Sequence, residues 1–171
     1  MLNTQVEVNK CTREGSRCEM VGLDIKIKNE YSNYLYKIFD RIDLSKYIWK
    51  INTEDFLYTD NGSTKQNFFG ADILSGEEFY RCISRDSYYM IFADIKAYPI
   101  GSTQTEIKTF GDFWESDCEI VFLCTDSTFV ELYSKDRSIL DRVYNNCKTN
   151  GFEDVKCRSF MDASERNLVA W

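Results

Sequence analysis

The chain has 171 residues, of which 43% are hydrophobic, 29% charged and 15% aromatic, a composition typical of one globular domain with an ordinary core. Its formal net charge of −7 argues against binding to DNA or RNA, which requires a basic surface. The chain contains no histidine, which excludes Ser-His and Cys-His nucleophile activation and every His-based metal site.

Hydropathy and cysteine usage predict a cytoplasmic protein. No stretch has the roughly 18 consecutive apolar residues that a membrane span requires, and residues 1–20 lack the apolar segment of a signal peptide. The seven cysteines are scattered without a disulfide framework, which fits reduced thiols in a cytosol.

The N-terminal part predicts an extension, a strand and a helix. Residues 1–19 are polar and without periodicity, which indicates a poorly ordered extension and makes Met20 a candidate for the natural start. Residues 21–28 alternate between apolar and polar side chains, the pattern of a strand with one wet face. We expect Asn29 to cap a helix that runs to about Arg41. Its core face is expected to carry Tyr31, Tyr34, Leu35 and Ile38.

The next segment predicts a second strand over residues 47–52. Residues 56–58 form a further short strand that pairs with it, before a turn cluster at residues 60–63. Residues 60–72 are expected to form a loop.

Two well-marked elements follow. Ser75 and Glu78 have the spacing of a capping box, which predicts a short helix. Residues 88–98 predict the longest strand, ended by Pro99. One of its faces is apolar throughout, at Tyr89, Ile91, Ala93, Ile95 and Ala97; the opposite face becomes polar from Asp94.

The C-terminal third is the most readable part of the chain. Thr109 is expected to cap a brief helix, and residues 118–124 predict an interior strand that forms a hairpin with residues 128–133. Asp136 and Gly151 mark the two ends of an amphipathic helix. Phe152, Val155 and Cys157 then indicate a last strand.

The element order predicts one α+β domain over residues 20–158, followed by a C-terminal tail at residues 159–171. We expect a mixed, mostly antiparallel sheet with three to four helices packed on it.

Motifs for chemistry are scarce. Cys118 and Cys124 are expected on the same face of one strand, about 20 Å apart at the rise of a strand, which is too far to share a metal ion. The glycines form no phosphate-binding loop, so no cofactor is expected. A hydrolytic pair would have to join Asp94 with Asp112 or Asp117; solvated surface carboxylates are the favoured interpretation of these residues.

Aromatic side chains offer a different candidate site. Tyr98, Phe113 and Trp114 flank the loop at residues 101–108, and Asp94 lies on the preceding strand. Loops held by a rigid sheet are common recognition surfaces. The alternative, which ordinary aromatic packing favours, is a small core beneath this loop.

Several segments carry a resemblance to a known family: residues 29–31, 42–47, 74–80, 92–99 and 116–119. They resemble a small family of uncharacterised proteins from Bacillus and related Gram-positive bacteria, catalogued as a domain of unknown function. The resemblance covers about residues 20–158 and implies that the first 19 residues lie outside the shared domain. It implies no activity, cofactor or residue role.

These observations lead to a functional hypothesis without a catalytic constellation. We expect a non-enzymatic, cytoplasmic protein-binding domain of the accessory, immunity or regulatory type, with Tyr98, Phe113, Trp114 and Asp94 as its binding residues. One alternative is a small-molecule binder or hydrolase with a site built from Asp, Glu and Tyr side chains. A second is a homo-oligomeric subunit, for example a homodimer.

Overall fold

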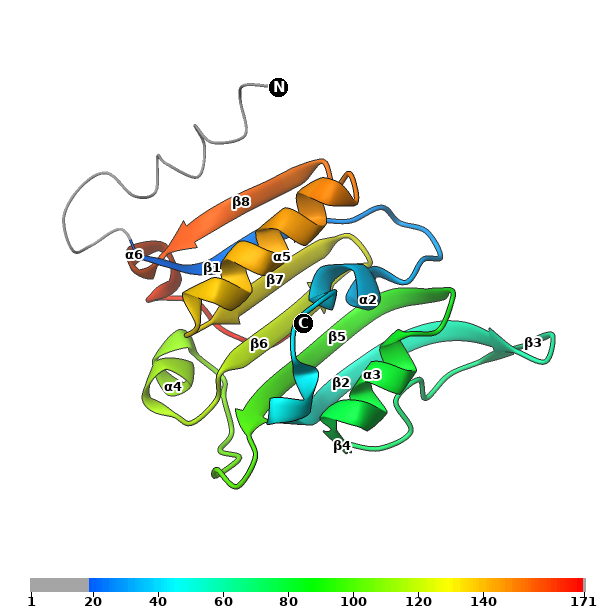
Figure 1. Cartoon of the computed structure of the whole chain (residues 1–171), viewed down its shortest axis with the longest axis horizontal. Helices are drawn as coiled ribbons and strands as arrows, with labels where there is room; N and C mark the ends of the chain where they lie inside the picture. The colour runs from blue at the N-terminus through cyan, green and yellow to red at the C-terminus, as the bar shows by residue number, and fades with distance from the viewer. Residues whose placement is uncertain (1–18, 171) are drawn as a thin grey trace.

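An eight-stranded sheet organises the structure, a computed structural model that describes residues 19–170 (Figure 1). Residues 1–18 of the predicted extension, which include Cys11 and Cys18, lie outside the described residues. Glu19, its last residue, is exposed. The strands are β1 (Met20–Lys26), β2 (Tyr47–Asp60), β3 (Ser63–Lys65), β4 (Ile73–Ser75), β5 (Tyr88–Pro99), β6 (Ile120–Thr125), β7 (Phe129–Ser134) and β8 (Asp154–Ser159). The helices are α2 (Tyr34–Phe39), α3 (Gly76–Ile83), α4 (Phe110–Glu115), α5 (Arg137–Thr149) and α6 (Phe160–Ala163), with a 3-10 turn η1 (Leu44–Lys46).

The strand order is β3-β2-β5-β6-β7-β1-β8, with β4 also paired to β2. The pairings among the described strands are all antiparallel. The predicted α+β domain with a mostly antiparallel sheet is thus confirmed. The first strand, β1, lies between β7 and β8, the last two strands of the chain.

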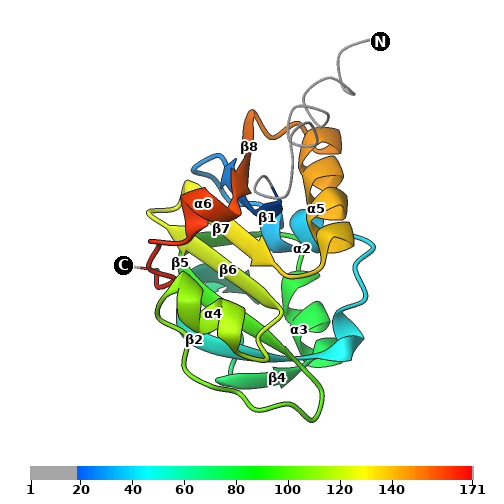
Figure 2. The same ribbon diagram turned by 90° about the vertical axis from the view of Figure 1, so that its left-hand side faces the viewer.

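Helices cover the two faces of the sheet unequally. Helices α2, α3 and α5 pack on one side, which we call the helical face, while α4 and α6 lie on the other side, which we call the second face (Figure 2). The core of the helical face is rich in aromatic rings: Trp49 and Phe79 are stacked with centroids 3.9 Å apart, and Phe39 contacts both. Among the described residues, no helix is both long and apolar enough to cross a membrane.

Predictions from capping signals are confirmed. Ser75 and Glu78 form a capping box at α3, and Thr109 forms one with Asp112 at α4. Asp136 accepts a hydrogen bond from the backbone of Ser138 at the start of α5.

The predicted start of the first helix is wrong. Helix α2 begins at Tyr34 and not after Asn29, because Ser32 exchanges two backbone hydrogen bonds with Tyr88 and is held extended. Tyr31 is consequently 50% exposed and packs beside Tyr89, with ring centroids 5.3 Å apart. It does not lie on the core face of the helix.

The two strands predicted at residues 47–52 and 56–58 are one strand, β2. Both halves pair with β5, with register irregularities between Ile51 and Thr53 and between Asp55 and Phe56. These irregularities interrupt the alternation of side chains, so the pattern resembled two strands. The predicted loop at residues 60–72 also contains β3, which pairs with the end of β2.

The predicted apolar face of β5 changes sides within the strand. Phe56 pairs with Met90 and Asp55 with Phe92, which leaves Ile91 as an extra residue. As a result, the core of the helical face contains Tyr88 and Met90 as well as Ala93, Ile95 and Ala97. The prediction of one unbroken face from Tyr89 onward is wrong at its first two positions.

Two further expectations are corrected. Cys118 and Cys124 lie on opposite faces: Cys118 belongs to the core of the second face and precedes β6, while Cys124 belongs to that of the helical face. The segment assigned to a C-terminal tail contains α6, and Ala163, Leu168 and Ala170 are buried in the second-face core. The folded domain therefore continues beyond residue 158.

Candidate functional site

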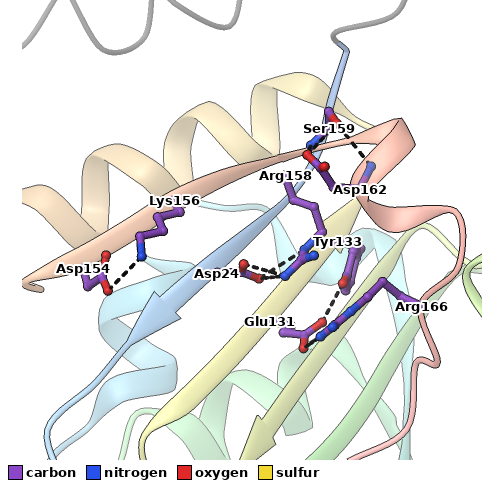
Figure 3. Close-up of polar contacts among 9 residues, drawn as sticks. All are labelled: Asp24, Glu131, Tyr133, Asp154, Lys156, Arg158, Ser159, Asp162 and Arg166. Atoms are coloured by element: carbon purple, nitrogen blue, oxygen red, sulfur yellow. Dashed lines mark hydrogen bonds and ion pairs between the residues drawn. The ribbon is translucent and has the colours of Figure 1, made fainter.

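A groove of about 460 Å³ opens on the second face, beside α6. We call it the charged groove; Figure 3 shows six of its charged side chains: Asp24, Glu131, Asp154, Lys156, Arg158 and Arg166. It is lined by Asp24, Ile25, Lys26, Thr125, Phe129, Val130, Glu131, Asp154, Lys156, Arg158 and Arg166.

Strand alternation and register bring the charges of this groove together. Asp24 of β1 is opposite Glu131 of β7 on one side and opposite Lys156 of β8 on the other. Because directly paired residues in a sheet point to the same face, three charged side chains from distant parts of the chain share one surface. Arg158 reaches the same surface two residues further along β8.

Arg158 and Asp24 form the better-shielded ion pair of the groove. The Arg158 side chain is 14% exposed, and its Nη2 donates a hydrogen bond to Asp24 Oδ1 at 2.6 Å while Nε donates to the same oxygen at 3.2 Å. Burial lowers the pKa of Arg158, but the hydrogen bond to Asp24 and nearby negative charge outweigh it and leave the pKa above its usual value.

A second pair joins the C-terminal segment to the sheet. Arg166 Nη2 donates a hydrogen bond to Glu131 Oε1, and the Tyr133 hydroxyl donates to Oε2 of the same carboxylate at 2.5 Å. Burial raises the pKa of Tyr133, and the hydrogen bond to Glu131 raises it further. The backbone carbonyl of Arg166 accepts from the Phe110 amide at 2.9 Å, which connects the groove to α4.

The acidic side chains of the groove are paired with cations. Asp154 lies 3.4 Å from Lys156, so this carboxylate, like Asp24 and Glu131, already has a cationic partner. The exposed ring of Phe129, 58% accessible, adds an apolar element to the lining. Within residues 19–170 no three His, Cys, Asp or Glu side chains are grouped so as to hold a metal ion.

An exposed apolar cluster lies next to the groove. Trp114 is 39% exposed, Phe160 36% and Met161 66%, and we call these three residues the aromatic patch. The Trp114 and Phe160 rings meet edge to face at 5.1 Å, and both contact the buried Phe110. Because β8 runs from Arg158 directly into α6, the patch adjoins the groove along the chain.

The structure separates the four predicted site residues. Tyr98 and Phe113 are buried in the second-face core, at 1% and 0% exposure, and the Tyr98 hydroxyl donates to the Thr105 carbonyl at 2.5 Å. These two residues belong to the small core beneath the loop at residues 101–108 that was the alternative interpretation. Trp114 alone of the four is exposed at the surface.

Asp94, the fourth predicted residue, is buried at 1% exposure and not solvated. It accepts hydrogen bonds from Lys96 Nζ and from Asn52 Nδ2, the latter at 3.2 Å, while its Oδ2 has no hydrogen-bond partner among the described residues. Lys96 is fully buried and also donates to the Leu168 carbonyl at 2.8 Å. Burial lowers the pKa of Lys96 despite the neighbouring carboxylate. The pair clamps the C-terminal segment onto β5.

Sequence reasoning missed most of the surface site. Arg158 is the penultimate residue of the last strand, while Phe160, Met161 and Arg166 lie in the segment assigned to a tail. One signal for α6 was present, because Ser159 and Asp162 have the spacing of a capping box and form one in the structure.

Comparison with known proteins gives a family but no activity. A family model described as a protein of unknown function (DUF2691) matches residues 20–169, a range that includes the charged groove and the aromatic patch. A curated relative, the uncharacterized protein YncE of Bacillus subtilis (strain 168), is 31% identical over 136 residues, which cover 79% of this chain and 89% of the relative. No solved structure matches the chain.

Proposed function

We propose that this chain, which belongs to the DUF2691 family of proteins of unknown function, is a non-enzymatic protein-binding domain that contacts its partner through the aromatic patch and the charged groove. This membership confirms the resemblance to a small Bacillus family. The observation that carries the proposal is the exposure of Trp114 and Phe160 in edge-to-face contact, with the exposed Met161 next to Phe160 in α6.

The composition of this surface supports protein recognition. Aromatic residues, methionine and arginine are enriched in protein interfaces, and tryptophan and arginine dominate the residues that contribute most of the binding energy. The aromatic patch supplies aromatic residues and methionine, and the charged groove supplies Arg158 and Arg166. Since Phe110 supports Trp114 and Phe160 from below, the patch is pre-organised and loses little side-chain entropy on binding.

The state of the ionisable groups argues against an acid-base mechanism in the groove. Burial raises the pKa of Glu54 and lowers that of Lys96, so both values move toward neutrality. Neither side chain lines the charged groove. The carboxylates Asp24 and Glu131 are held by arginines, and a small ligand would first have to displace one of these ion pairs. We place the interaction in the cytoplasm, a proposal supported by the cysteine content of the sequence.

Affinity purification tests the proposal. The tagged chain, its Trp114→Ala variant and a Tyr80→Ala control would be purified from cytosolic extract of the organism that encodes it. Tyr80 is 50% exposed but lies on α3, on the helical face. We expect a near-stoichiometric partner with the wild type and the control that is lost with Trp114→Ala. Equal recovery with Trp114→Ala, or no partner above background, would contradict the proposal.

A further inference from the structure

The two segments that carry the aromatic patch also carry acidic side chains. These segments, α4 and residues 159–165, contain four exposed carboxylates and neither lysine nor arginine. We call these carboxylates the acidic rim: Asp112, Glu115, Asp162 and Glu165.

Two members of the rim are firmly ionised at neutral pH. Hydrogen bonds from the backbone of Lys108 and Thr109 hold the pKa of Asp112 below its usual value. Hydrogen bonds from the Ser159 side chain and, to a lesser extent, from the Ser159 backbone hold the pKa of Asp162 below its usual value. Both carboxylates remain exposed while they cap their helices, so their charge is still presented to solvent.

Basic residues near the two segments already have acidic or carbonyl partners. Lys108, which precedes α4 and acts on Asp112, lies 3.2 Å from Glu106. Arg158 is held by Asp24 and Arg166 by Glu131. Lys135 Nζ donates to the Ser116 carbonyl. The four carboxylates of the rim thus add to the negative charge of a chain whose formal net charge is −7.

From this arrangement we infer that the partner segment that sits on the aromatic patch is basic as well as apolar, with lysine or arginine side chains interspersed among bulky apolar ones. Its apolar side chains cover Trp114, Phe160 and Met161, and its cations face the acidic rim. The inference rests on the proposed protein-binding function and specifies the chemistry of the partner.

Electrostatics disfavours other occupants of the same surface. A twofold dimer that used the patch on both copies would bring two acidic rims together, since residue i meets residue j and j meets i in such an interface. Like charges placed across an interface suppress association. The patch therefore fits a different, basic chain better than a second copy of this one.

A pair of synthetic peptides provides the test. Both are amphipathic helices of about 18 residues with the same leucine positions; one carries lysine and the other glutamate on its polar face. Binding to the full chain would be followed by fluorescence anisotropy of a label on the peptide. We expect the lysine peptide to bind and the glutamate peptide not to bind.

Two matched variants separate the rim from the overall charge of the protein. Glu115→Gln with Glu165→Gln removes two rim charges, while Glu77→Gln with Glu153→Gln removes two exposed charges from α3 and from the turn before β8. We expect the first pair to weaken binding of the lysine peptide about fivefold and the control pair to weaken it less than about twofold. Trp114→Ala should weaken it at least about tenfold.

Three results would overturn the inference: no binding of the lysine peptide up to about 1 mM, equal binding of the glutamate peptide, or equal weakening by the two variant pairs. The last result would mean that the net charge alone attracts the peptide. Any of them leaves the proposed function standing if Trp114→Ala still loses the natural partner in the purification, so the two failures can be told apart.

Discussion

The buried ammonium of Lys96 donates a hydrogen bond to the backbone carbonyl of Leu168, 72 residues further along the chain. This contact fastens the C-terminal segment to the centre of the sheet. The same segment carries Arg166 into the charged groove and pairs with residues next to α4 through Asn167 and Thr109. A buried clamp thus fixes the geometry of an exposed surface.

We expect Lys96→Met to lower the free energy of unfolding by about 3–5 kcal/mol, because it leaves Asp94 buried without its cation. Adding Asp94→Asn should recover more than half of this loss, since the uncompensated charge is then removed. Urea unfolding of the wild type, the single and the double variant would measure both effects. A loss below about 1 kcal/mol for Lys96→Met would show that the pair does not clamp the segment.

Tyr88→Phe tests how α2 is held in place. The Tyr88 hydroxyl accepts a hydrogen bond from the Leu35 amide at 3.1 Å and donates to the Ile83 carbonyl at 3.2 Å. Its removal leaves both buried groups without a partner, and we expect a loss of about 2 kcal/mol in chemical unfolding. Tyr89→Phe, at the next and less buried position, is the control and should change stability by less than about 0.5 kcal/mol. Equal effects of the two changes would refute this role.

Gly76 and Gly111 should respond in opposite directions to alanine. A Cβ atom on Gly76 would lie 2.1 Å from the Leu44 carbonyl oxygen and 2.6 Å from the Ser45 Cα, which are backbone atoms of η1. Gly76→Ala must therefore push α3 away from η1, and we expect it to cost about 3 kcal/mol or more. Gly111 has only a 3.7 Å contact with the Thr109 side chain, so Gly111→Ala in α4 should stabilise by about 0.5–1 kcal/mol. Thermal melts of the two variants would reveal the contrast.

Acid should weaken the two helices that carry the aromatic patch. The folded-state pKa of Asp112 and of Asp162 lies below the ordinary aspartate value of 3.8, so each carboxylate contributes stability above that pH. The contribution is lost as the pH falls through the folded pKa. We expect the melting temperature to fall between about pH 4 and pH 2, and to fall less steeply in the variant with Asp112→Asn and Asp162→Asn. Parallel curves for the variant and the wild type would contradict this origin.

Local signals in the sequence were enough for much of the fold. Strand alternation located β1 and most of β5, and capping residues located α3, α4 and α5, because these features depend on neighbours along the chain. The irregularities in β2 and β5 depend on the partner strand. The same holds for Ser32, whose pairing with Tyr88 delays the start of α2.

The candidate site was harder to predict than the fold. Trp114 was identified because it is one of the aromatic residues that flank the loop at residues 101–108, whereas Tyr98 and Phe113 flank the same loop and are buried. The charged groove depends on β1 lying between β7 and β8, since this order brings Asp24 beside both Glu131 and Lys156. Local patterns along the chain do not specify the order of strands in a sheet, and the ion pairs that follow from this order were therefore not expected.

The place of β1 between β7 and β8 also constrains when the protein can finish folding. Strands β2, β5, β6 and β7 follow one another in space in the order of their synthesis and can associate while the chain is still growing. The outer slot beside β1 stays empty until residues 154–159 have left the ribosome, so β8 is the last strand to join the described sheet. Because this step joins segments about 130 residues apart, it has a high contact order and should be the slow step of folding.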